Sequence, residues 1–464
     1  MESRSDGQAG RSRPGRRWRV ALAVAAVSAL AAVLVATTVS TGSVESASST
    51  AGRDAGAHAA VISPTSAPVP STTTTTPPPP VCDRRPALDA GTESVPAELQ
   101  ARVDAALAHP AWSGLDRSIS VWVEGYGEVV AVEPDRALLP ASNQKLFTAL
   151  GAHLLLDPQG RFRTEVRQTD DRLVLVAGGD PTLRSAGPHS LSALAAQVRA
   201  AGVATAAAMV VDASHFEAST TARGWQDWQV PIYVGPMSAL VVDDNRTRTD
   251  AAYLADPALG NATAFAARLG TAGVGVEPVV VHGEAQPTDP VVAALESPTF
   301  GELTRTMLVR SDNEVAESLL REIGAGSTDE GLARIAAALE PWCLHLAGAG
   351  GDGSGLSRAN LRSAREWRRL LQVAAVQPWG PTFVGQLPVA GVSGTLSGRL
   401  RGPATHGSVR AKTGSIIGGS ALSGYATTSD GRTAVFSVVV NGEPGVAQGS
   451  VTAIDRLVAA VVGL

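Results

Sequence analysis

Lysine is nearly absent from this chain of 464 residues, although basic residues are not. Of the 38 basic residues only two, Lys145 and Lys412, are lysines, and all the others are arginines. Arginine stays protonated in proteins, whereas a lysine that is shielded from water can lose its proton. The two lysines are therefore candidates for acid–base chemistry that arginine cannot perform.

Other absences exclude whole classes of protein. The eight histidines do not show metal-ligand spacing such as His-Glu-x-x-His, and no Gly-x-Ser-x-Gly nucleophile elbow occurs, so we expect no metal and no cofactor. The pair Gly178-Gly179 is not a nucleotide-binding loop, because no lysine opens a helix after it. Beyond the first 19 residues there is no basic stripe, which argues against nucleic acid as a partner.

Charge and hydrophobicity are unevenly placed at the N-terminus. Residues 1–19 contain six arginines and two acidic residues, a charge of +4 in a chain of net charge −5. The 20 residues Val20–Val39 are Ala, Val and Leu apart from three hydroxyl residues, which is long enough to span a bilayer. We expect a cytoplasmic tail at 1–19, a single-pass signal anchor at 20–39, and an extracytoplasmic remainder. A cleaved signal peptide is the alternative, and it would leave the protein secreted.

The chain after the hydrophobic run is rich in Ser, Thr, Ala, Gly and Pro as far as residue 81, and we expect a linker at 40–98. The chain has two cysteines, Cys82 just past the Pro-rich run and Cys343 in the C-terminal half. In an exported protein an even number of cysteines indicates a disulfide, which here would join the two ends of the folded region. Two unrelated thiols are the alternative.

Hydrophobic periodicity predicts a mixed α/β fold. A hairpin is expected within residues 118–132, and an apolar helix follows Pro140. Two further helices are expected at 303–309 and 314–323, with an interruption at 311–313. Three strands and a closing helix are predicted at 409–413, 421–427, 433–440 and 451–462. These elements predict an antiparallel sheet flanked by helices, formed by residues 99–165 and 290–464, with an α/β domain inserted at 166–289.

The first lysine follows a serine at helical spacing. Ser142 precedes Lys145 by three residues at the start of the predicted helix. Residues three apart lie on one face of a helix, so the amine can reach the hydroxyl. A neutral lysine there can take the serine proton and activate a nucleophile that is weak at its own pKa. In most proteins such a pair is an ordinary helix surface, and it decides nothing alone.

The second lysine begins the run Lys412-Thr413-Gly414-Ser415 on a predicted strand, and Ser311-Asp312-Asn313 lies between the two lysines. We expect Gly414, which has no side chain, to let a substrate backbone lie against the strand. Each run alone is usually a strand end, a turn or a helix cap. Chance places both lysines in these two motifs roughly once in a thousand such chains. The combination therefore indicates a catalytic site.

With these three motifs the chain resembles the serine penicillin-recognising enzymes, and more specifically the D-Ala-D-Ala carboxypeptidase/endopeptidase family of class C low-molecular-mass penicillin-binding proteins. The similarity covers about residues 99–464, and its most specific run is Asp-Gly-Ser-Gly-Leu-Ser-Arg at 352–358. Other similar runs are found at 175–181, 224–225, 391–396, 409–411 and 422–425. The resemblance implies a β-lactamase/transpeptidase-like domain that is split by an insertion. Ser311 follows Ser142 by only 169 positions, so we expect one inserted domain.

The resemblance also implies what each catalytic residue does. Ser142 would attack the carbonyl between two D-alanines, with Lys145 as the base. Ser311 and Lys412 would relay a proton to the leaving D-alanine, and water would then release the acyl-enzyme. The implied substrates are peptidoglycan stem peptides, and β-lactam antibiotics are the implied inhibitors. The resemblance does not distinguish trimming of the terminal D-alanine from cutting of cross-links.

The remaining motif residues would bind the substrate. Asn313 would hydrogen-bond the peptide amide. Thr413 and Ser415, on the strand that includes Gly414, would hold the terminal carboxylate together with the lysine charge. The backbone N–H groups of Ser142 and Ser415 would form the oxyanion hole.

Three other functions remain as alternatives on the same scaffold. A β-lactamase needs a carboxylate that activates the deacylating water, and no such motif follows Ser311-Asp312-Asn313. A serine esterase is poorly excluded by residues alone. A non-catalytic penicillin sensor or wall-binding module would keep the fold without turnover, and the presence of all three motifs argues against it.

Overall fold

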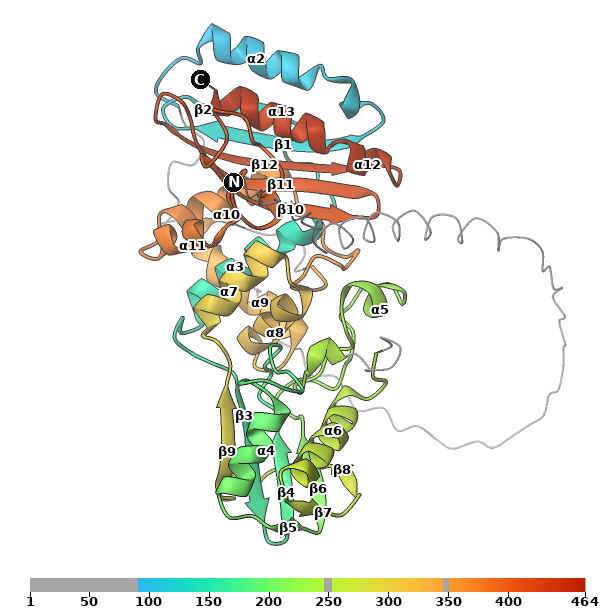
Figure 1. Cartoon of the computed structure of the whole chain (residues 1–464). Coiled ribbons are helices and arrows are strands. Elements are labelled where there is room, and N and C mark those ends of the chain that lie inside the picture. The colour runs from blue at the N-terminus through green and yellow to red at the C-terminus, as the bar shows by residue number, and fades with distance from the viewer. Residues whose placement is uncertain (1–90, 246–252, 345–349, 464) are drawn as a thin grey trace, which may run out of the picture. The chain divides into compact units, whose positions relative to one another are not determined.

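The structure, a computed structural model, describes residues 91–245, 253–344 and 350–463. They all belong to one unit of the chain, Pro77–Leu464, and contain two five-stranded sheets with helices around them (Figure 1). The predicted cytoplasmic tail and signal anchor, residues 1–39, lie outside the described residues. Within the described ranges, no helix combines the length and the apolar character needed to cross a bilayer.

The first sheet is antiparallel throughout, with the strand order β10-β11-β12-β1-β2. β1 pairs with β12, so the beginning and the end of the folded chain meet in the middle of one sheet. This confirms the predicted antiparallel sheet. The strand bounds are β1 Asp116–Val123, β2 Gly127–Val132, β10 Val409–Ile416, β11 Gly419–Thr427 and β12 Thr433–Asn441.

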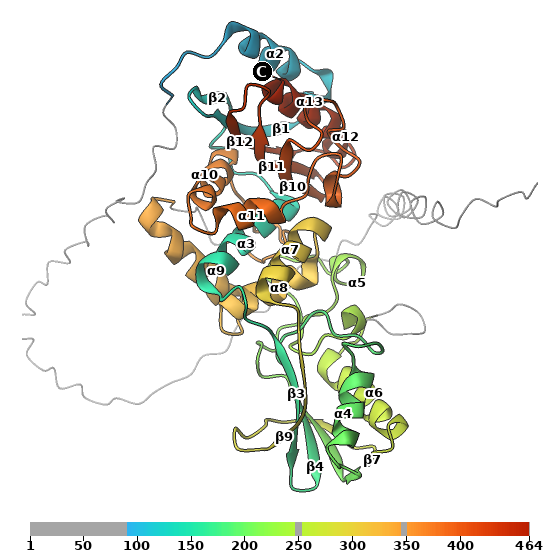
Figure 2. The ribbon, with the colours of Figure 1, turned by 60° about the vertical axis from the view of Figure 1, so that its left-hand side comes forward.

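Helices cover both faces of this sheet (Figures 1 and 2). α2 and α13 pack together on one face, and α10 packs on the other, beside a group of helices that includes the one after Ser142. The helix bounds are α2 Ala97–Leu107, α3 Gln144–Leu155, α7 Phe300–Arg310, α8 Asn313–Ile323, α9 Thr328–Leu339, α10 Ala364–Ala375, α11 Gly380–Gln386, α12 Val446–Gly449 and α13 Val451–Val462.

Alternate residues of β12 contribute to two apolar cores. Phe436 and Val438 belong to the core under α2 and α13, and Val435 and Val439 belong to the core under α10 and α3. Successive side chains of a strand point to opposite faces, and here both faces are covered. The strand is therefore buried along nearly its whole length, and its sequence is almost continuously apolar.

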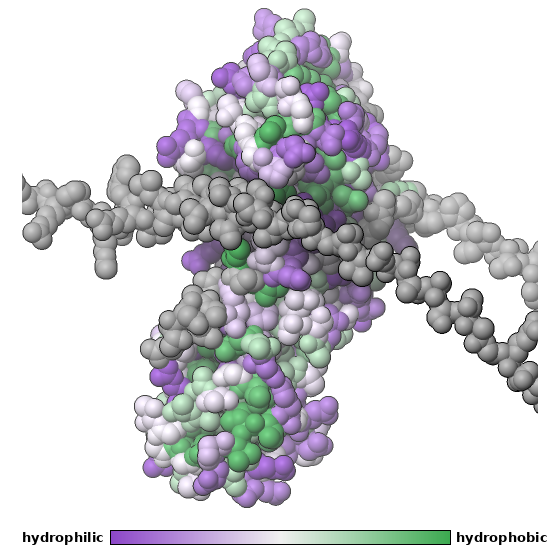
Figure 3. All heavy atoms as spheres, turned by 90° about the vertical axis from the view of Figure 1, so that its right-hand side faces the viewer, coloured by the Kyte–Doolittle hydropathy of each residue, from purple (hydrophilic) through white to green (hydrophobic). Residues whose placement is uncertain are grey.

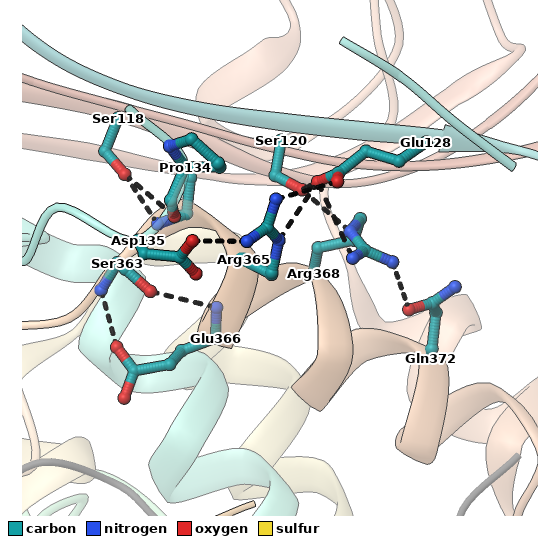
Figure 4. A network of polar contacts seen from close by, with 11 residues as sticks. Ser118, Ser120, Glu128, Pro134, Asp135, Ser363, Arg365, Glu366, Arg368 and Gln372 are labelled. Carbon is teal, nitrogen blue, oxygen red and sulfur yellow. Dashed lines mark hydrogen bonds and ion pairs between the residues drawn. The ribbon is translucent and has the colours of Figure 1, made fainter. Parts of the chain in front are cut away.

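A partly buried ion-pair network joins α10 to the first sheet (Figure 4). Arg368 is fully buried and donates hydrogen bonds to Ser120 Oγ over 2.7 Å and to Gln372 Oε1 over 2.8 Å. Its guanidinium lies 3.7 Å from Glu128, which also accepts a hydrogen bond of 2.8 Å from Arg365. Such hydrogen bonds are what a buried ion pair needs to offset the loss of hydration. The network therefore holds α10 at a fixed place on β1 and β2.

The chain between α3 and α7 forms a second, mixed sheet in the order β8-β6-β4-β3-β9. β3 is antiparallel to β4 and β9, whereas β6 is parallel to β4 and β8. α4 and α6 pack against this sheet (Figure 2), and β5 pairs with β7 separately. The bounds are β3 Arg163–Thr169, β4 Arg172–Val176, α4 Leu191–Ala200, β5 Thr205–Ala206, β6 Ala208–Asp212, α5 Gln229–Tyr233, α6 Pro257–Thr271, β7 Gly275–Val276, β8 Val280–His282 and β9 Val291–Glu296.

The strands that lead into and out of the insert both belong to this second sheet. The sheet begins at Arg163 and ends at Glu296, so it extends beyond the predicted bounds 166 and 289 at both ends. An apolar run such as β9 contains no sign of which sheet it joins, because pairing depends on tertiary neighbours. Apolar side chains also gather on the surface of the insert, low in the view of Figure 3.

Cys343 is disulfide-bonded and follows the 3₁₀ helix Glu340–Trp342. Cys82 lies outside the described residues, so the Cys82–Cys343 bridge stays a prediction.

Candidate active site

Ser142 lies in the 3₁₀ turn η4 (Ala141–Asn143), directly before α3. Ala141 has a φ of 49°, a conformation that non-glycine residues adopt only where their surroundings hold them. Lys145, in the first turn of α3, donates a hydrogen bond from Nζ to Ser142 Oγ over 3.1 Å. The structure therefore brings the predicted nucleophile and base within reach of a direct proton transfer.

Lys145 is fully buried. Its Nζ also donates to Asn313 Oδ1 over 2.7 Å and to the carbonyl oxygen of Ser354 over 2.5 Å. Burial lowers the pKa of Lys145 to about 8, and Asp352 is the strongest of the acidic groups that oppose this shift. Near neutral pH a fraction of the molecules therefore carries a neutral amine that can accept the proton of Ser142.

Ser311 and Lys412 form a second hydroxyl–amine pair. Lys412 Nζ donates to Ser311 Oγ and to the carbonyl oxygen of Thr413, both over 2.9 Å. Ser311 ends α7 with a left-handed φ of 61°, and this break between α7 and α8 directs its hydroxyl into the site. Asp312 is the N-cap of α8, accepting a hydrogen bond from Val315 N over 3.0 Å. The middle residue of the motif thus has the ordinary role of a helix cap.

The surroundings of Lys412 oppose its positive charge, and its predicted role in holding the terminal carboxylate stays a prediction. The side chain is fully buried, and both burial and the nearby charge of Lys145 hold its pKa well below the ordinary value. Both effects favour loss of the Lys412 proton relative to an exposed lysine. A carboxylate that enters the site would favour the ammonium form again.

Asn313 is the first residue of α8, and both the oxygen and the nitrogen of its side-chain amide have a hydrogen-bond partner. Oδ1 accepts from Lys145, and Nδ2 donates to the carbonyl oxygen of Tyr233 over 2.8 Å. A carboxamide has two lone pairs and two N–H groups, so one of each remains for a substrate amide.

β10 is the edge strand of the first sheet. At the start of the strand, the main-chain groups on the side away from β11 are paired with residues 388–390: Ala390 N donates to Val409 O, and Ala411 N donates to Pro388 O. Main-chain groups of an antiparallel strand alternate between its two sides, so Thr413 and Ser415 face the same edge further along. Ser415 is exposed there. The strand therefore presents main-chain groups to a ligand beside Ser142.

Gly414 has a packing role inside the fold that the sequence did not predict. A Cβ at this position would lie 2.5 Å from Pro140 O and 3.3 Å from the Ala141 Cβ. The missing side chain therefore admits the turn that carries Ser142. That Gly414 also makes room for a substrate backbone stays a prediction.

Asp352 is a residue of the site to which the sequence pattern gave no role. It is fully buried, and its carboxylate accepts hydrogen bonds of 2.6–3.2 Å from six donors. These bonds fix the loop 352–357, whose Ser354 carbonyl accepts from Lys145. Gly355 lies so close to the nucleophile that a Cβ there would be 2.0 Å from Ala141 O. The Asp-Gly-Ser-Gly run is therefore a wall of the active site.

Two more side chains extend the site. Asn143, next to the nucleophile, donates to Ser423 Oγ over 2.6 Å, which ties η4 to β11. Thr413 Oγ1 donates to Thr395 Oγ1 over 2.8 Å, and Thr395 belongs to the short helix Gly394–Leu396. Within the described ranges no group of three His, Cys, Asp or Glu side chains is placed to hold a metal ion.

A serine beside a buried lysine, a second serine–lysine pair and a glycine-containing edge strand are the parts of a serine penicillin-recognising enzyme. The chain belongs to the D-Ala-D-Ala carboxypeptidase 3 (S13) family, which matches residues 99–256 and 246–461. It is therefore a serine-type carboxypeptidase of the penicillin-binding class that acts on peptidoglycan.

Curated relatives agree with this membership. A D-alanyl-D-alanine carboxypeptidase of Actinomadura sp. is 34% identical over 456 residues, covering 78% of this chain and 84% of the relative. Carboxypeptidase DacB of Mycolicibacterium smegmatis is 34% identical, covering 69% of this chain and 74% of the relative. Both matches span most of the relative's length.

Two solved structures support the fold. Penicillin binding protein 4 of Haemophilus influenzae matches with a TM-score of 0.70 at 21% identity, over 79% of this chain and 99% of that one. A peptidoglycan endopeptidase of Bdellovibrio bacteriovorus matches with a TM-score of 0.51 at 16% identity, over 75% of this chain and 92% of that one. The predicted fold, a helix-flanked antiparallel sheet with an inserted α/β domain, is confirmed.

Proposed function

We propose that the enzyme cleaves the bond between two D-alanines of peptidoglycan stem peptides through an acyl-enzyme on Ser142. The observation that carries this proposal is the buried amine of Lys145, which lies 3.1 Å from Ser142 Oγ and has a pKa of about 8. A serine hydroxyl is a weak nucleophile until a neighbouring base removes its proton.

Acylation begins when the neutral amine of Lys145 takes the proton of Ser142 Oγ. The oxygen attacks the carbonyl carbon of the penultimate D-alanine, and the backbone N–H groups of Ser142 and Ser415 stabilise the resulting oxyanion. The peptide lies along the open part of β10, where it adds a short strand to the sheet edge.

The leaving D-alanine needs a proton on its nitrogen as the C–N bond breaks. Ser311 is placed to deliver it, since its hydroxyl accepts a hydrogen bond from Lys412 Nζ over 2.9 Å. The terminal carboxylate lies near Lys412, Thr413 and Ser415. Water then attacks the ester, which releases the shortened peptide and restores the Ser142 hydroxyl.

Labelling with a fluorescent penicillin tests the nucleophile. The wild-type chain should form a long-lived covalent adduct, because a β-lactam presents a carbonyl like that of D-Ala-D-Ala. Ser142→Ala should lose the adduct, whereas Ser192→Ala, which changes a serine of α4 in the insert, should keep it. Undiminished labelling of Ser142→Ala would remove Ser142 as the nucleophile, and hydrolysis of the penicillin in many turnovers would favour a β-lactamase.

The same chemistry serves trimming and cross-link cutting, because both break a D-alanyl bond. We propose that the enzyme carries out both. Digestion of purified cross-linked muropeptides distinguishes them: trimming releases free D-alanine, and endopeptidase cleavage releases monomers. Release of D-alanine without monomers would restrict the activity to carboxypeptidase.

We also propose that the enzyme works on the outer face of the cell membrane, anchored through residues 20–39 with 40–98 as its linker. The support is the length of the hydrophobic run and the arginines before it. Fractionation should place the mature protein in the membrane. Mature protein in the culture medium with an N-terminus beyond residue 39 would overturn this part of the proposal.

A further inference from the structure

A segment of the insert contacts the catalytic loop that holds Lys145. This segment, residues 223–235, is called the strap here, and the loop comprises residues 350–358. Trp225 and Val234 of the strap share a small apolar cluster with Leu356 of the loop. Two hydrogen bonds are donated by the loop: Arg358 N donates to Gly224 O over 3.1 Å, and Ser357 Oγ donates to Arg223 O over 2.6 Å. Two more are donated by the strap: Gln229 Nε2 donates to Leu356 O over 3.1 Å, and the Arg223 guanidinium donates to Gly350 O over 2.5 Å.

One bond of the strap reaches the centre of the loop. Trp225 Nε1 donates to Asp352 Oδ2 over 2.7 Å. The same carboxylate oxygen accepts from Ser354 Oγ over 2.6 Å, and the Ser354 carbonyl accepts from Lys145 Nζ over 2.5 Å. Hydrogen bonds therefore link the insert to Asp352 and Asp352 to the Ser354 hydroxyl, and the Ser354 carbonyl, on the same residue, bonds the amine beside Ser142.

We infer that Trp225 is a positioning residue for the catalytic lysine, and that the insert sets the position and proton affinity of Lys145 through it. The inference rests on the proposed function only in taking Lys145 as the base. The insert is then part of the catalytic machinery, although all three catalytic motifs lie outside it.

The physical basis is the cost of an imperfectly satisfied buried carboxylate. Asp352 is fully buried and is held by six donors, so the loss of one donor shifts the carboxylate toward its remaining partners. Ser354 moves with it, and its carbonyl no longer meets Lys145 Nζ at short distance. Hydrogen bonds to the charged form stabilise that form, so Lys145 loses stabilisation of its ammonium and its pKa falls.

The other groups that act on Lys145 stay in place in such a variant. The charge of Asp352 itself is retained, so the change acts through the Ser354 carbonyl. The further charged groups that influence Lys145 are Asp312, Glu314 and Glu317, all of which raise its pKa, and Lys412 across the site.

The test is Trp225→Phe in the full chain, since phenylalanine keeps an aromatic ring and removes the N–H. The matched control is Trp112→Phe. Trp112 is buried, whereas Trp225 is partly buried, and it also donates its indole N–H, over 2.9 Å to Ala106 O, but in the core under α2 and α13. Penicillin acylation is measured against pH for both variants. Because the chain has two lysines, lysine labelled with ¹³C at Cε gives two NMR signals that report their titration without any need for activity.

Above the apparent pKa, where Lys145 is neutral in both proteins, Trp225→Phe should acylate about tenfold more slowly because its amine is displaced from Ser142 Oγ, on the scale of one hydrogen bond to a buried charge. The acid limb of its pH profile and the titration of the Lys145 signal should both move to lower pH. Trp112→Phe should match the wild type in both readouts. Ser357→Ala, which removes a different strap–loop bond, should move both readouts in the same direction by less and provides the same test if Trp225→Phe does not fold.

Wild-type titration of Lys145 in Trp225→Phe, with wild-type acylation, would overturn the inference. The same holds for Ser357→Ala if it serves as the test. Absence of penicillin acylation in the wild-type chain would instead refute the proposed function, and the NMR titration would still decide whether Trp225 controls Lys145.

Discussion

Lys145 and Lys412 lie in the same active site, but the regions around them are opposite in charge. Acidic side chains influence Lys145: Asp352, Asp312, Glu314 and Glu317 all oppose the effect of its burial. For Lys412 the described residues contribute burial and the positive charge of Lys145, which act in the same direction. The helix lysine is thus held at a pKa of about 8, whereas the strand lysine is driven toward its neutral form.

This difference indicates how two buried lysines can share one site. The surrounding carboxylates prepare Lys145 to exchange a proton near neutral pH, which a general base must do. Lys412 lacks such support until a substrate brings its own carboxylate. We propose that binding of the terminal carboxylate raises the proton affinity of Lys412, which a ligand without that carboxylate would not do.

Lys145→Arg should have the largest effect and tests the first half of the comparison. Arginine keeps the positive charge but cannot become neutral, so acylation by penicillin should fall by about 10³-fold or more. Circular dichroism should show a folded protein, although the larger head in a buried site lowers its melting temperature. Acylation that recovers at high pH in Lys145→Arg would contradict the role of Lys145 as the base.

Lys412→Met tests the part of the comparison that concerns Lys412. Methionine has a similar length and no charge, so kcat/KM for a D-Ala-D-Ala peptide should fall about 10²-fold through loss of charge stabilisation. For the same peptide with a C-terminal amide, kcat/KM should fall much less, because this peptide lacks the carboxylate that Lys412 is proposed to bind. Arg172→Met, which removes an exposed cation from the insert, should leave both substrates unaffected. An equal loss on both substrates would show that Lys412 does not recognise the carboxylate.

The pH dependence of acylation should follow Lys145. Its neutral form is the active one, so kcat/KM should rise with pH and level off above an apparent pKa of about 8. Below that value the rate should fall about tenfold per pH unit. Rates measured with a neutral β-lactam ester between pH 5 and 10 would check this, and a rate that falls as pH rises through 8 would contradict it.

Much of the site could be predicted from sequence because its signals are local. Ser142 and Lys145 share one helical turn, and Lys412 to Ser415 lie on one strand, so each spacing reports geometry directly. The scarcity of lysine made these positions stand out. The strands could be predicted for the same reason. β12, for example, is almost continuously apolar because both of its faces are covered, and an apolar run is a local signal.

The unpredicted parts depend on contacts between distant segments. Asp352 matters because six donors converge on it, and one of them, Trp225, is 127 positions away. Gly414 is needed because a turn near Pro140 lies against it. The lowered pKa of Lys412 follows from complete burial, which no motif encodes. Such features follow from tertiary packing, and spacing along the chain contains no trace of them.

Glu317→Gln should change stability in a pH-dependent way. Burial raises the pKa of Glu317 to about 7 from its ordinary 4.5, so the folded state holds this proton more tightly than the unfolded state. That contribution to stability is complete below about pH 4.5 and is lost as pH rises through 7. The free energy of unfolding of Glu317→Gln, taken relative to wild type, should therefore rise by about 1–3 kcal/mol from pH 5 to pH 9. Urea unfolding at both pH values measures this, with exposed Glu330→Gln as the control, and a difference that is equal at both would contradict it.

Thr395→Val should have the smallest effect and tests how the carboxylate side of the site is held. Thr413 Oγ1 donates to Thr395 Oγ1 over 2.8 Å, and this bond orients the hydroxyl of a residue proposed to bind the carboxylate. Valine has nearly the same shape but cannot accept the bond, so Thr413 should rotate among other positions. Because the bond is exposed, its loss should raise KM for a D-Ala-D-Ala peptide about two- to fivefold, with kcat and the pH profile unchanged. Thr271→Val, on an exposed face of α6, removes a hydroxyl from the insert and should leave KM unchanged. A fall in kcat with constant KM would move Thr395 from binding the ground state to the chemical step, and the division between a carboxylate side at Lys412 and a base side at Lys145 would then be wrong.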